Sequence, residues 1–252
     1  GSEMCIRDSP SPDKVSELVE TGLIKYIIPE FTEIVGMEQN NPYHCHSVDI
    51  HTYECLKHIE ADTALRWTVY LHDLGKGRTK STDENGIDHF YGHPAVSAKM
   101  AQKVMKRLKF DNKTYDKVSK LVMCHDNRFA ISKKSIRKAV SNIGSQDFED
   151  FLKVKAADIY GQNPSFLNRH LEQLGEVREL YQEILEDEEC LTFKDLALNG
   201  NDIISLGVNK GKTVGLVLKG LLEEVLENPE LNSKDKLTEI GLKVIKAVEE
   251  DE

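Results

Sequence analysis

The chain has 252 residues, of which 39% are apolar and 30% are charged, and its formal net charge is −10. This length and apolar content allow a sizeable core and argue against disorder of the whole chain, and no stretch approaches the ~20 continuous apolar residues of a membrane span. The five cysteines are odd in number and include no Cys-x-x-Cys pair, so neither a disulfide framework nor a zinc knuckle is indicated, and we expect a cytoplasmic protein with no membrane partner.

The first residues show no apolar periodicity. Residues 1–10 resemble a tag or cloning remnant, and we exclude them from the fold prediction. Ser11, Pro12 and Asp13 are typical of a helix start, because Ser can cap the helix and Pro suits its first turn. The apolar spacing that follows predicts a helix that ends near Gly22, within a helical lead-in over residues 11–45.

Helical apolar stripes separated by short polar breaks follow along the rest of the chain, and the alternation typical of strands is scarce. The sequence therefore predicts an all-α fold. A polar, Gly-containing loop is expected over residues 79–92, and an acidic break over 186–189. We expect helices over residues 46–60, 63–75, 94–109, 112–125, 133–143, 147–161, 167–187, 211–226 and 234–249.

The central chemical motif is His72-Asp73, within the string YLHDLGKG. Adjacent residues on a helix point about 100° apart, so both can reach one ion only at a helix edge near a break. Gly75 and Gly77 provide such a break, and the apolar residues before the pair would hold it still. Imidazole and carboxylate together indicate a divalent metal ion.

A metal ion needs more donors than this pair, so other ligands must come from elsewhere in the chain. His51 lies on the preceding amphipathic helix, and packing of the two helices would bring its imidazole to the pair. Asp158 lies in the string KAADIYG, where the small alanines permit close helix approach. A carboxylate in such apolar surroundings is costly unless it is paired or bound to metal.

In this order His51, His72, Asp73 and Asp158 resemble the HD superfamily of metal-dependent phosphohydrolases. The resemblance implies a helical HD-domain bundle over residues 46–187, followed by a C-terminal helical tail over residues 188–252. It implies that these four residues bind a divalent ion, which could be Mg, Mn, Ni, Fe or Zn. The sequence does not distinguish one ion from two.

The same resemblance assigns roles to further residues near the motif. His93 and His125 match positions that contact a substrate phosphate or a second metal ion in some members, and Lys76 is placed to neutralise phosphate charge. Asp73 is both a ligand and the candidate base for the attacking water. The implied reaction is hydrolysis of a phosphate ester by a metal-activated water, with Asp73, His93, His125 and Lys76 as catalytic residues.

The flanks of the motif are similar to the body and tail of bacterial CCA-adding tRNA nucleotidyltransferases. The strings are EQNNPYH at residues 38–44 and KDLALNGND at residues 194–202, and Asp-Leu-Ala-x-Asn-Gly is the distinguishing part. The catalytic head of that family, with its Gly-Ser and paired-aspartate metal site, has no counterpart in this sequence. We therefore do not expect nucleotide addition, and the resemblance implies tRNA or a phosphorylated nucleotide as the partner.

Charge is unevenly distributed along the chain. Residues 99–138 hold thirteen Lys or Arg and three Asp, a formal charge of +10, so the remainder carries −20. A basic segment of this kind can bind RNA phosphates, although a solvated surface is the ordinary alternative. We select Lys133, Lys134, Arg137 and Lys138 as candidate RNA-binding residues. Aromatic residues are sparse in this segment, so stacking on bases is not indicated there.

Three functions remain open from the sequence. The first is a metal-dependent phosphodiesterase or phosphatase that acts on RNA-terminal or 2′,3′-cyclic phosphates. The second is a binding module that grips tRNA and retains the ligands without activity. The third is an HD hydrolase that acts on free nucleotides.

Overall fold

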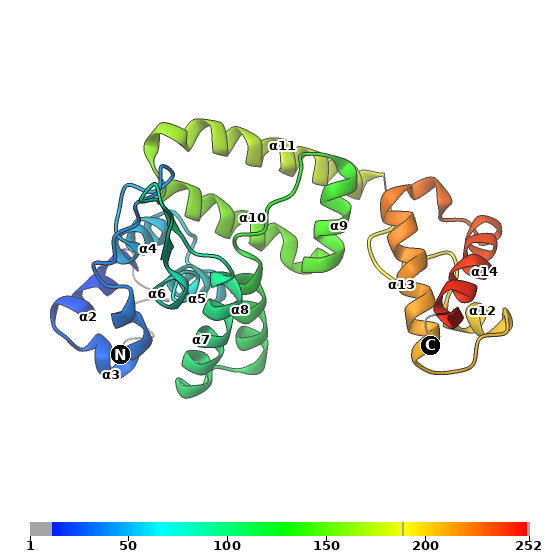
Figure 1. The fold of residues 1–252 in the computed structure, drawn as a ribbon, viewed down its shortest axis with the longest axis horizontal. Coiled ribbons are helices and arrows are strands. Elements are labelled where there is room, and N and C mark those ends of the chain that lie inside the picture. The colour runs from blue at the N-terminus through cyan, green and yellow to red at the C-terminus, as the bar shows by residue number, and fades with distance from the viewer. Residues whose placement is uncertain (1–11, 188, 251–252) are drawn as a thin grey trace. The chain divides into compact units, whose positions relative to one another are not determined.

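The computed structural model describes residues 12–187 and 189–250, and its fold is all-α apart from one short hairpin (Figure 1). The predicted tag lies outside the described residues. Two compact units divide the chain. Unit 1 contains the described residues up to Arg128 together with Gln146–Gly175, and unit 2 contains Phe129–Ser145 and the described residues from Glu176 onward. The domain boundary expected at residue 187 stays a prediction.

Unit 1 is built mainly of helices that were expected from the apolar periodicity. A 3₁₀ turn and one short helix replace the single helix predicted at the start of the lead-in, and they end near Gly22 as expected, where φ is 68°. A second short helix follows. The elements are η1 (Pro12–Val15), α2 (Ser16–Glu20), α3 (Ile24–Ile27), η2 (Pro29–Glu33), α4 (Val48–Lys57), α5 (Thr63–Leu71), α6 (Lys76–Thr79), α7 (His93–Arg107), α8 (Asn112–Cys124), α10 (Ser145–Tyr160), η3 (Pro164–Phe166) and the start of α11 (Leu167–Glu186).

The segment expected to be a loop contains a small antiparallel hairpin. Strands β1 (Ser81–Thr82) and β2 (Asp88–His89) pair with Ser81 opposite His89. Asp88 secures the hairpin, because its carboxylate accepts hydrogen bonds from the Asn40 backbone and the Thr82 hydroxyl. A two-residue pairing is too short to show as alternation in the sequence, which explains why it was missed.

The core of unit 1 centres on α5, which is buried along its whole length. The ring of Tyr70 stacks on Phe31 with centroids 4.7 Å apart, and Trp67 meets Phe110 edge-on at 5.1 Å. Helix α5 packs against α4 and α8, and α7 packs against α8. Residues at the C-terminal end of α5 are therefore held by helices on several sides.

Unit 2 has a separate apolar core. Its elements are α9 (Lys133–Ile143), the remainder of α11, α12 (Gly200–Ser205), α13 (Lys212–Glu227), η4 (Pro229–Leu231) and α14 (Lys234–Glu250). Helix α12 was not predicted, although Asn199 and Asp202 form a capping box at its start. The core side chains are Cys190, Leu196, Leu198, Ile203, Val208, Val217, Leu221, Leu222, Val225, Leu226, Leu237 and Ile245.

Candidate metal centre

The His72-Asp73 pair lies in a turn directly after α5. The helix ends at Leu71, one turn earlier than predicted, and both side chains are 2% exposed. Gly75 permits this turn to touch α7, since a Cβ at that position would lie 2.4 Å from the carbonyl oxygen of His93. The expected break in the helix is thus confirmed, and it directs both side chains of the pair toward neighbouring helices.

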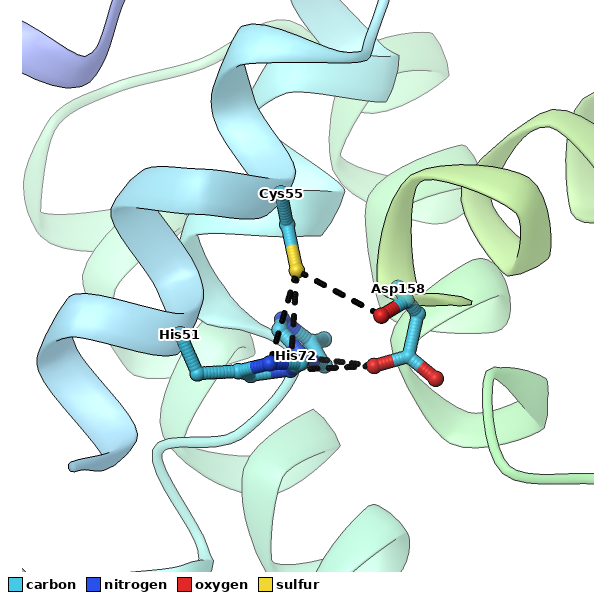
Figure 2. Close-up of side chains that lie close together, drawn as sticks. All are labelled: His51, Cys55, His72 and Asp158. Carbon is cyan, nitrogen blue, oxygen red and sulfur yellow. Dashed lines mark hydrogen bonds and ion pairs between the residues drawn. The ribbon is translucent and has the colours of Figure 1, made fainter. Parts of the chain in front are cut away.

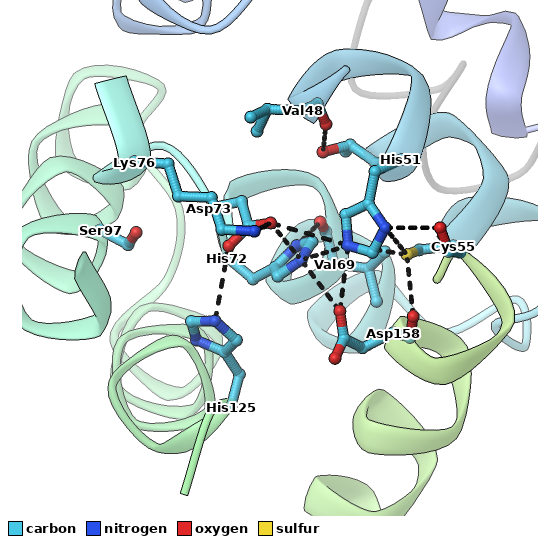
Figure 3. Close-up of polar contacts among 12 residues, drawn as sticks. Val48, His51, Cys55, Val69, His72, Asp73, Lys76, Ser97, His125 and Asp158 are labelled. Atoms are coloured by element: carbon cyan, nitrogen blue, oxygen red, sulfur yellow. Dashed lines mark hydrogen bonds and ion pairs between the residues drawn. The ribbon is translucent and has the colours of Figure 1, made fainter. Parts of the chain in front are cut away.

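Four donor atoms from three parts of the chain converge beside this turn (Figure 3). His51 Nε2 lies 3.0 Å from Asp158 Oδ1, 3.4 Å from His72 Nε2 and 3.6 Å from Asp73 Oδ2. His72 Nε2 lies 3.2 Å from Asp73 Oδ2 and 3.6 Å from Asp158 Oδ1. The four residues selected as metal ligands are therefore brought together, although Asp158 lies 107 residues after His51.

A second group of donors meets the other oxygen of Asp73. His93 Nε2 and His125 Nε2 lie 3.0 Å apart, and their distances to Asp73 Oδ1 are 3.4 and 3.6 Å. His93 begins α7 and His125 follows the last residue of α8, so the close packing of these two helices brings the imidazoles together. Asp73 thus faces one pair of histidines with each carboxylate oxygen.

Backbone carbonyl groups fix the tautomer of all four imidazoles. The Nδ1–H groups of His72, His93 and His125 donate to the carbonyl oxygens three residues earlier, at 2.6, 2.8 and 2.7 Å. His51 Nδ1–H donates to the carbonyl of Gly161 at 2.8 Å. A carbonyl can only accept, so each neutral ring presents an unprotonated Nε2 to the site. Metal-binding histidines have this arrangement.

Bare Nε2 atoms and carboxylate oxygens at these distances repel one another unless a proton or a cation lies between them. Donors about 2.1 Å from an ion are about 3.0 Å apart in an octahedral shell and about 3.4 Å apart in a tetrahedral one, and the observed distances between the donor atoms run from 3.0 to 3.6 Å. Asp73 Oδ2 is buried and accepts no hydrogen bond within the described chain, although Lys76 Nζ is 2.8 Å away. These residues fit a divalent cation.

The electrostatics show how strongly the site attracts positive charge. Burial opposes protonation of His72, but the carboxylates of Asp73 and Asp158 outweigh it and raise the pKa of His72 to about 10. Burial likewise disfavours the charged form of Asp73, yet His72 and Lys76 hold its pKa well below the ordinary value. Burial lowers the pKa of His125. Ionised carboxylates facing imidazoles are the condition for binding a cation.

Lys76 contacts the ligand turn itself. Its side chain is buried, its Nζ donates to Gln39 Oε1 at 2.7 Å, and it lies over the ring of Phe90 at 5.3 Å from the centroid. The ammonium group also lies 2.8 Å from Asp73 Oδ2, so it adds positive charge beside the ligand turn.

Sequence reasoning missed three side chains that surround the ligands. Cys55 Sγ is buried 3.5 Å from His51 Nε2, and burial raises the pKa of its thiol (Figure 2). Gln162 Nε2 donates to Asp158 Oδ2 at 2.9 Å, and Lys155 Nζ donates to the His125 carbonyl at 3.0 Å. All three lie three or four residues from a ligand, and this helical spacing is a signal that could have revealed them.

The candidate RNA-binding residues lie in unit 2, where each engages acidic groups. Lys133 pairs with Glu183 at 3.1 Å and Asp187 at 2.9 Å, and Lys134 and Lys138 both pair with Glu227. Arg137 is only 5% exposed, and it pairs with Glu189 at 2.7 Å. Its guanidinium group also donates to the carbonyls of Leu226 and Glu227.

Comparison with known families identifies the helical region around these ligands. The family model described as "HD domain" matches residues 43–162, a range that includes all of the converging histidines and both aspartates. The chain contains an HD domain. No described helix combines the length and the apolar character that a bilayer crossing requires.

The curated relatives of this chain include a tRNA nucleotidyltransferase. The chain is 30% identical over 226 residues to the A-adding tRNA nucleotidyltransferase of Deinococcus radiodurans, and the match covers 84% of this chain and 51% of that protein. It is 32% identical over 108 residues to the multifunctional CCA protein of Actinobacillus pleuropneumoniae, covering 39% and 25%. The chain is homologous to the C-terminal region of CCA-adding tRNA nucleotidyltransferases, and it spans about half the length of the Deinococcus protein.

A third relative has a different named activity. The chain is 26% identical over 211 residues to the bifunctional uridylyltransferase/uridylyl-removing enzyme of Cereibacter sphaeroides, covering 72% of this chain and 21% of that protein. The relatives of this chain thus have more than one named activity.

Proposed function

We propose that the HD domain of this chain is a metal-dependent phosphohydrolase. The observation that carries this proposal is the convergence of Nε2 atoms from His51, His72, His93 and His125 on the two oxygens of Asp73. Each ring donates its Nδ1–H to a backbone carbonyl, so the Nε2 atoms all face the site. A role in packing alone would not require four buried imidazoles to share this orientation.

His51, His72, Asp73 and Asp158 would hold one divalent ion. When bound, the ion would polarise a phosphoryl oxygen and lower the pKa of a coordinated water toward 7. Asp73 would accept a proton from the attacking water at the carboxylate oxygen that faces His93 and His125. These two histidines would bind a phosphate oxygen or a second ion, and Lys76 would add positive charge against the phosphate.

The substrate class follows from the relatives rather than from the metal centre. Two of the compared proteins are named as an A-adding tRNA nucleotidyltransferase and a multifunctional CCA protein, and the third is named for removal of a uridylyl group, which is a nucleotide attached through phosphate. We therefore propose RNA-terminal phosphates or 2′,3′-cyclic phosphates as substrates. Free nucleotides are a competing possibility, and competition between tRNA and nucleotides in the assay separates the two.

The test is metal-dependent hydrolysis of a 2′,3′-cyclic nucleotide. His72→Ala and Asp73→Ala should abolish activity while the helical circular dichroism spectrum is retained. His58→Ala is the matched control, because His58 lies at the end of α4, exposed and stacked on Tyr160 at 4.1 Å. Activity that survives in the two ligand variants, or that is equally lost in His58→Ala, would refute the proposal.

A second function is favoured by the basic segment and by the relatives that act on tRNA: a module that binds tRNA without hydrolysis. It predicts that His72→Ala binds tRNA as tightly as the unmodified chain. It also predicts that charge reversal at Lys133, Lys134 and Lys138 weakens binding in a salt-dependent way. Arg137 should be tested separately, because it is buried and its loss would disturb unit 2 itself.

A further inference from the structure

Three aromatic rings gather where α10 gives way to α11. Tyr43 and Phe166 have ring centroids 5.1 Å apart, and Phe166 stacks on His170 at 5.8 Å with an interplanar angle of 16°. Tyr43 and His170 lie 6.2 Å apart. We call these three residues the aromatic platform. All of them belong to unit 1, which also contains the metal centre.

Short connections join the platform to the metal ligands. Only the turn at 161–163 separates α10, which carries Asp158, from Phe166 in η3. The ends of this turn are tied on both sides: Gly161 accepts the hydrogen bond from His51, and Asn163 N–H donates to the Tyr43 carbonyl at 2.9 Å. The platform is therefore fixed to the same backbone that orients two of the ligands.

The platform also lies within the electrostatic field of the centre. Burial lowers the pKa of His170, and the nearby Arg169 lowers it further, while the carboxylate of Asp158 acts in the opposite direction. Arg128 and Lys155 contribute to the same field. Three cationic side chains, Arg169, Arg128 and Lys155, thus act electrostatically on the His170 ring.

The rings are not sealed into the core. Tyr43 is 46% exposed, and Phe166 and His170 are half-buried. A cluster that served only to close the α10–α11 connection would be expected to bury its largest ring, since exposure forfeits the stabilisation from removing apolar area from water. Exposed aromatic rings beside cations are the combination with which proteins stack bases and neutralise phosphate.

We propose that the aromatic platform stacks the base of a nucleotide whose phosphate is held at the metal centre. This inference rests on the proposed phosphohydrolase function and adds a specificity determinant to it. The platform would favour phosphate esters that carry a nucleotide base over phosphate esters that carry none. The platform lies outside the basic segment of residues 99–138, for which stacking was not indicated.

The experiment compares two substrates that differ only in the base: 2′,3′-cyclic AMP and methyl riboside 2′,3′-cyclic phosphate. Stacking on one aromatic residue contributes about 1–3 kcal/mol, so Phe166→Leu should lower kcat/KM for cyclic AMP by roughly 5- to 150-fold, mainly through KM. The substrate without a base should change less than about twofold on the same reasoning. Tyr43→Leu serves as the second variant should Phe166→Leu melt early.

Tyr26→Leu is the matched control, because Tyr26 is 76% exposed on α3 and its ring lies 5.0 Å from the ammonium of the neighbouring Lys25. It should alter neither substrate. An equal loss for both substrates in the platform variants, or no loss for either, overturns the platform and leaves the hydrolase intact. Loss of the difference in kcat/KM between the two substrates in Tyr26→Leu would likewise overturn the platform and leave the hydrolase intact.

A binding measurement separates failure of the platform from failure of the hydrolase. A 2-aminopurine ribonucleotide should lose fluorescence when it binds the Mn²⁺-loaded chain, because stacking quenches the base, and Phe166→Leu should abolish the quenching. Quenching without hydrolysis of either substrate would refute the phosphohydrolase and retain the platform. Hydrolysis without Phe166-dependent quenching would refute the platform.

Discussion

Gly161 lies at the contact between α10 and α4, and its replacement by Ala tests how the metal centre is assembled. A Cβ at this position would lie 2.4 Å from Cys55 Sγ, 2.7 Å from His51 Nδ1 and 2.9 Å from the His51 carbonyl oxygen. All three distances are below ordinary contact, and the third atom belongs to helix backbone. We expect Gly161→Ala to displace α4 and the imidazole of His51.

The expected magnitude follows from the cost of overpacking a buried contact, about 1–3 kcal/mol. At about 2–4 °C per kcal/mol for a domain of this size, the melting temperature should fall by roughly 2–12 °C. Gly161 also orients His51 through its carbonyl, and loss of such a partner typically weakens metal binding about 10- to 100-fold. Thermal unfolding and Mn²⁺ titration by calorimetry measure the two effects.

Gly175→Ala is the matched control, because Gly175 lies within α11 and a Cβ there meets nothing within 4 Å. Ala is favoured over Gly in a helix by about 1 kcal/mol, so this variant should melt slightly higher and bind Mn²⁺ unchanged. A Gly161→Ala chain that melts no lower than the unmodified chain and binds Mn²⁺ as tightly would refute the close contact.

Three further predictions concern other parts of the molecule. Arg137→Ala removes one partner of its buried pair with Glu189, and it should destabilise unit 2 by about 3–5 kcal/mol in denaturant unfolding. Asn199→Ala removes the cap of α12 and should cost about 1 kcal/mol in the same measurement. The hydrogen bond from Lys80 lowers the pKa of Asp88 to about 2, so the Asp88 contribution is complete above its unfolded pKa and is lost as pH falls through about 2. The difference in melting temperature between the unmodified chain and Asp88→Asn should therefore be constant above pH 5 and shrink between pH 4 and 2, and a difference that does not depend on pH would contradict this assignment.

The helical periodicity predicted most of the fold because long amphipathic stripes dominate it. Helix α9 lies at the predicted residues 133–143, and α7, α8, α13 and α14 differ from prediction by at most two residues at each end. The helical periodicity did not predict the shorter elements. The six residues of α12 span fewer than two turns, and the Asn199–Asp202 capping box was the available signal.

The order of His51, His72-Asp73 and Asp158 along helices was enough to predict that these side chains meet. The sequence could not show that each imidazole donates Nδ1–H to a backbone carbonyl, because that depends on the path of the turns after α5 and α8. It also could not place Tyr43 beside Phe166, since 123 residues separate them and neither lies in a periodic stripe. Pairings of this kind arise from tertiary packing alone.

The carboxylate of Asp73 has a consequence for how this centre could change during evolution. The two oxygens of Asp73 face two different histidine pairs. A substitution at Asp73 that changes the surroundings of one pair therefore also changes those of the other. Divergence is thus easier at peripheral residues such as Lys155 and Gln162, which hydrogen-bond to His125 and Asp158, respectively. A single substitution at Asp73 would therefore alter the surroundings of both histidine pairs at once.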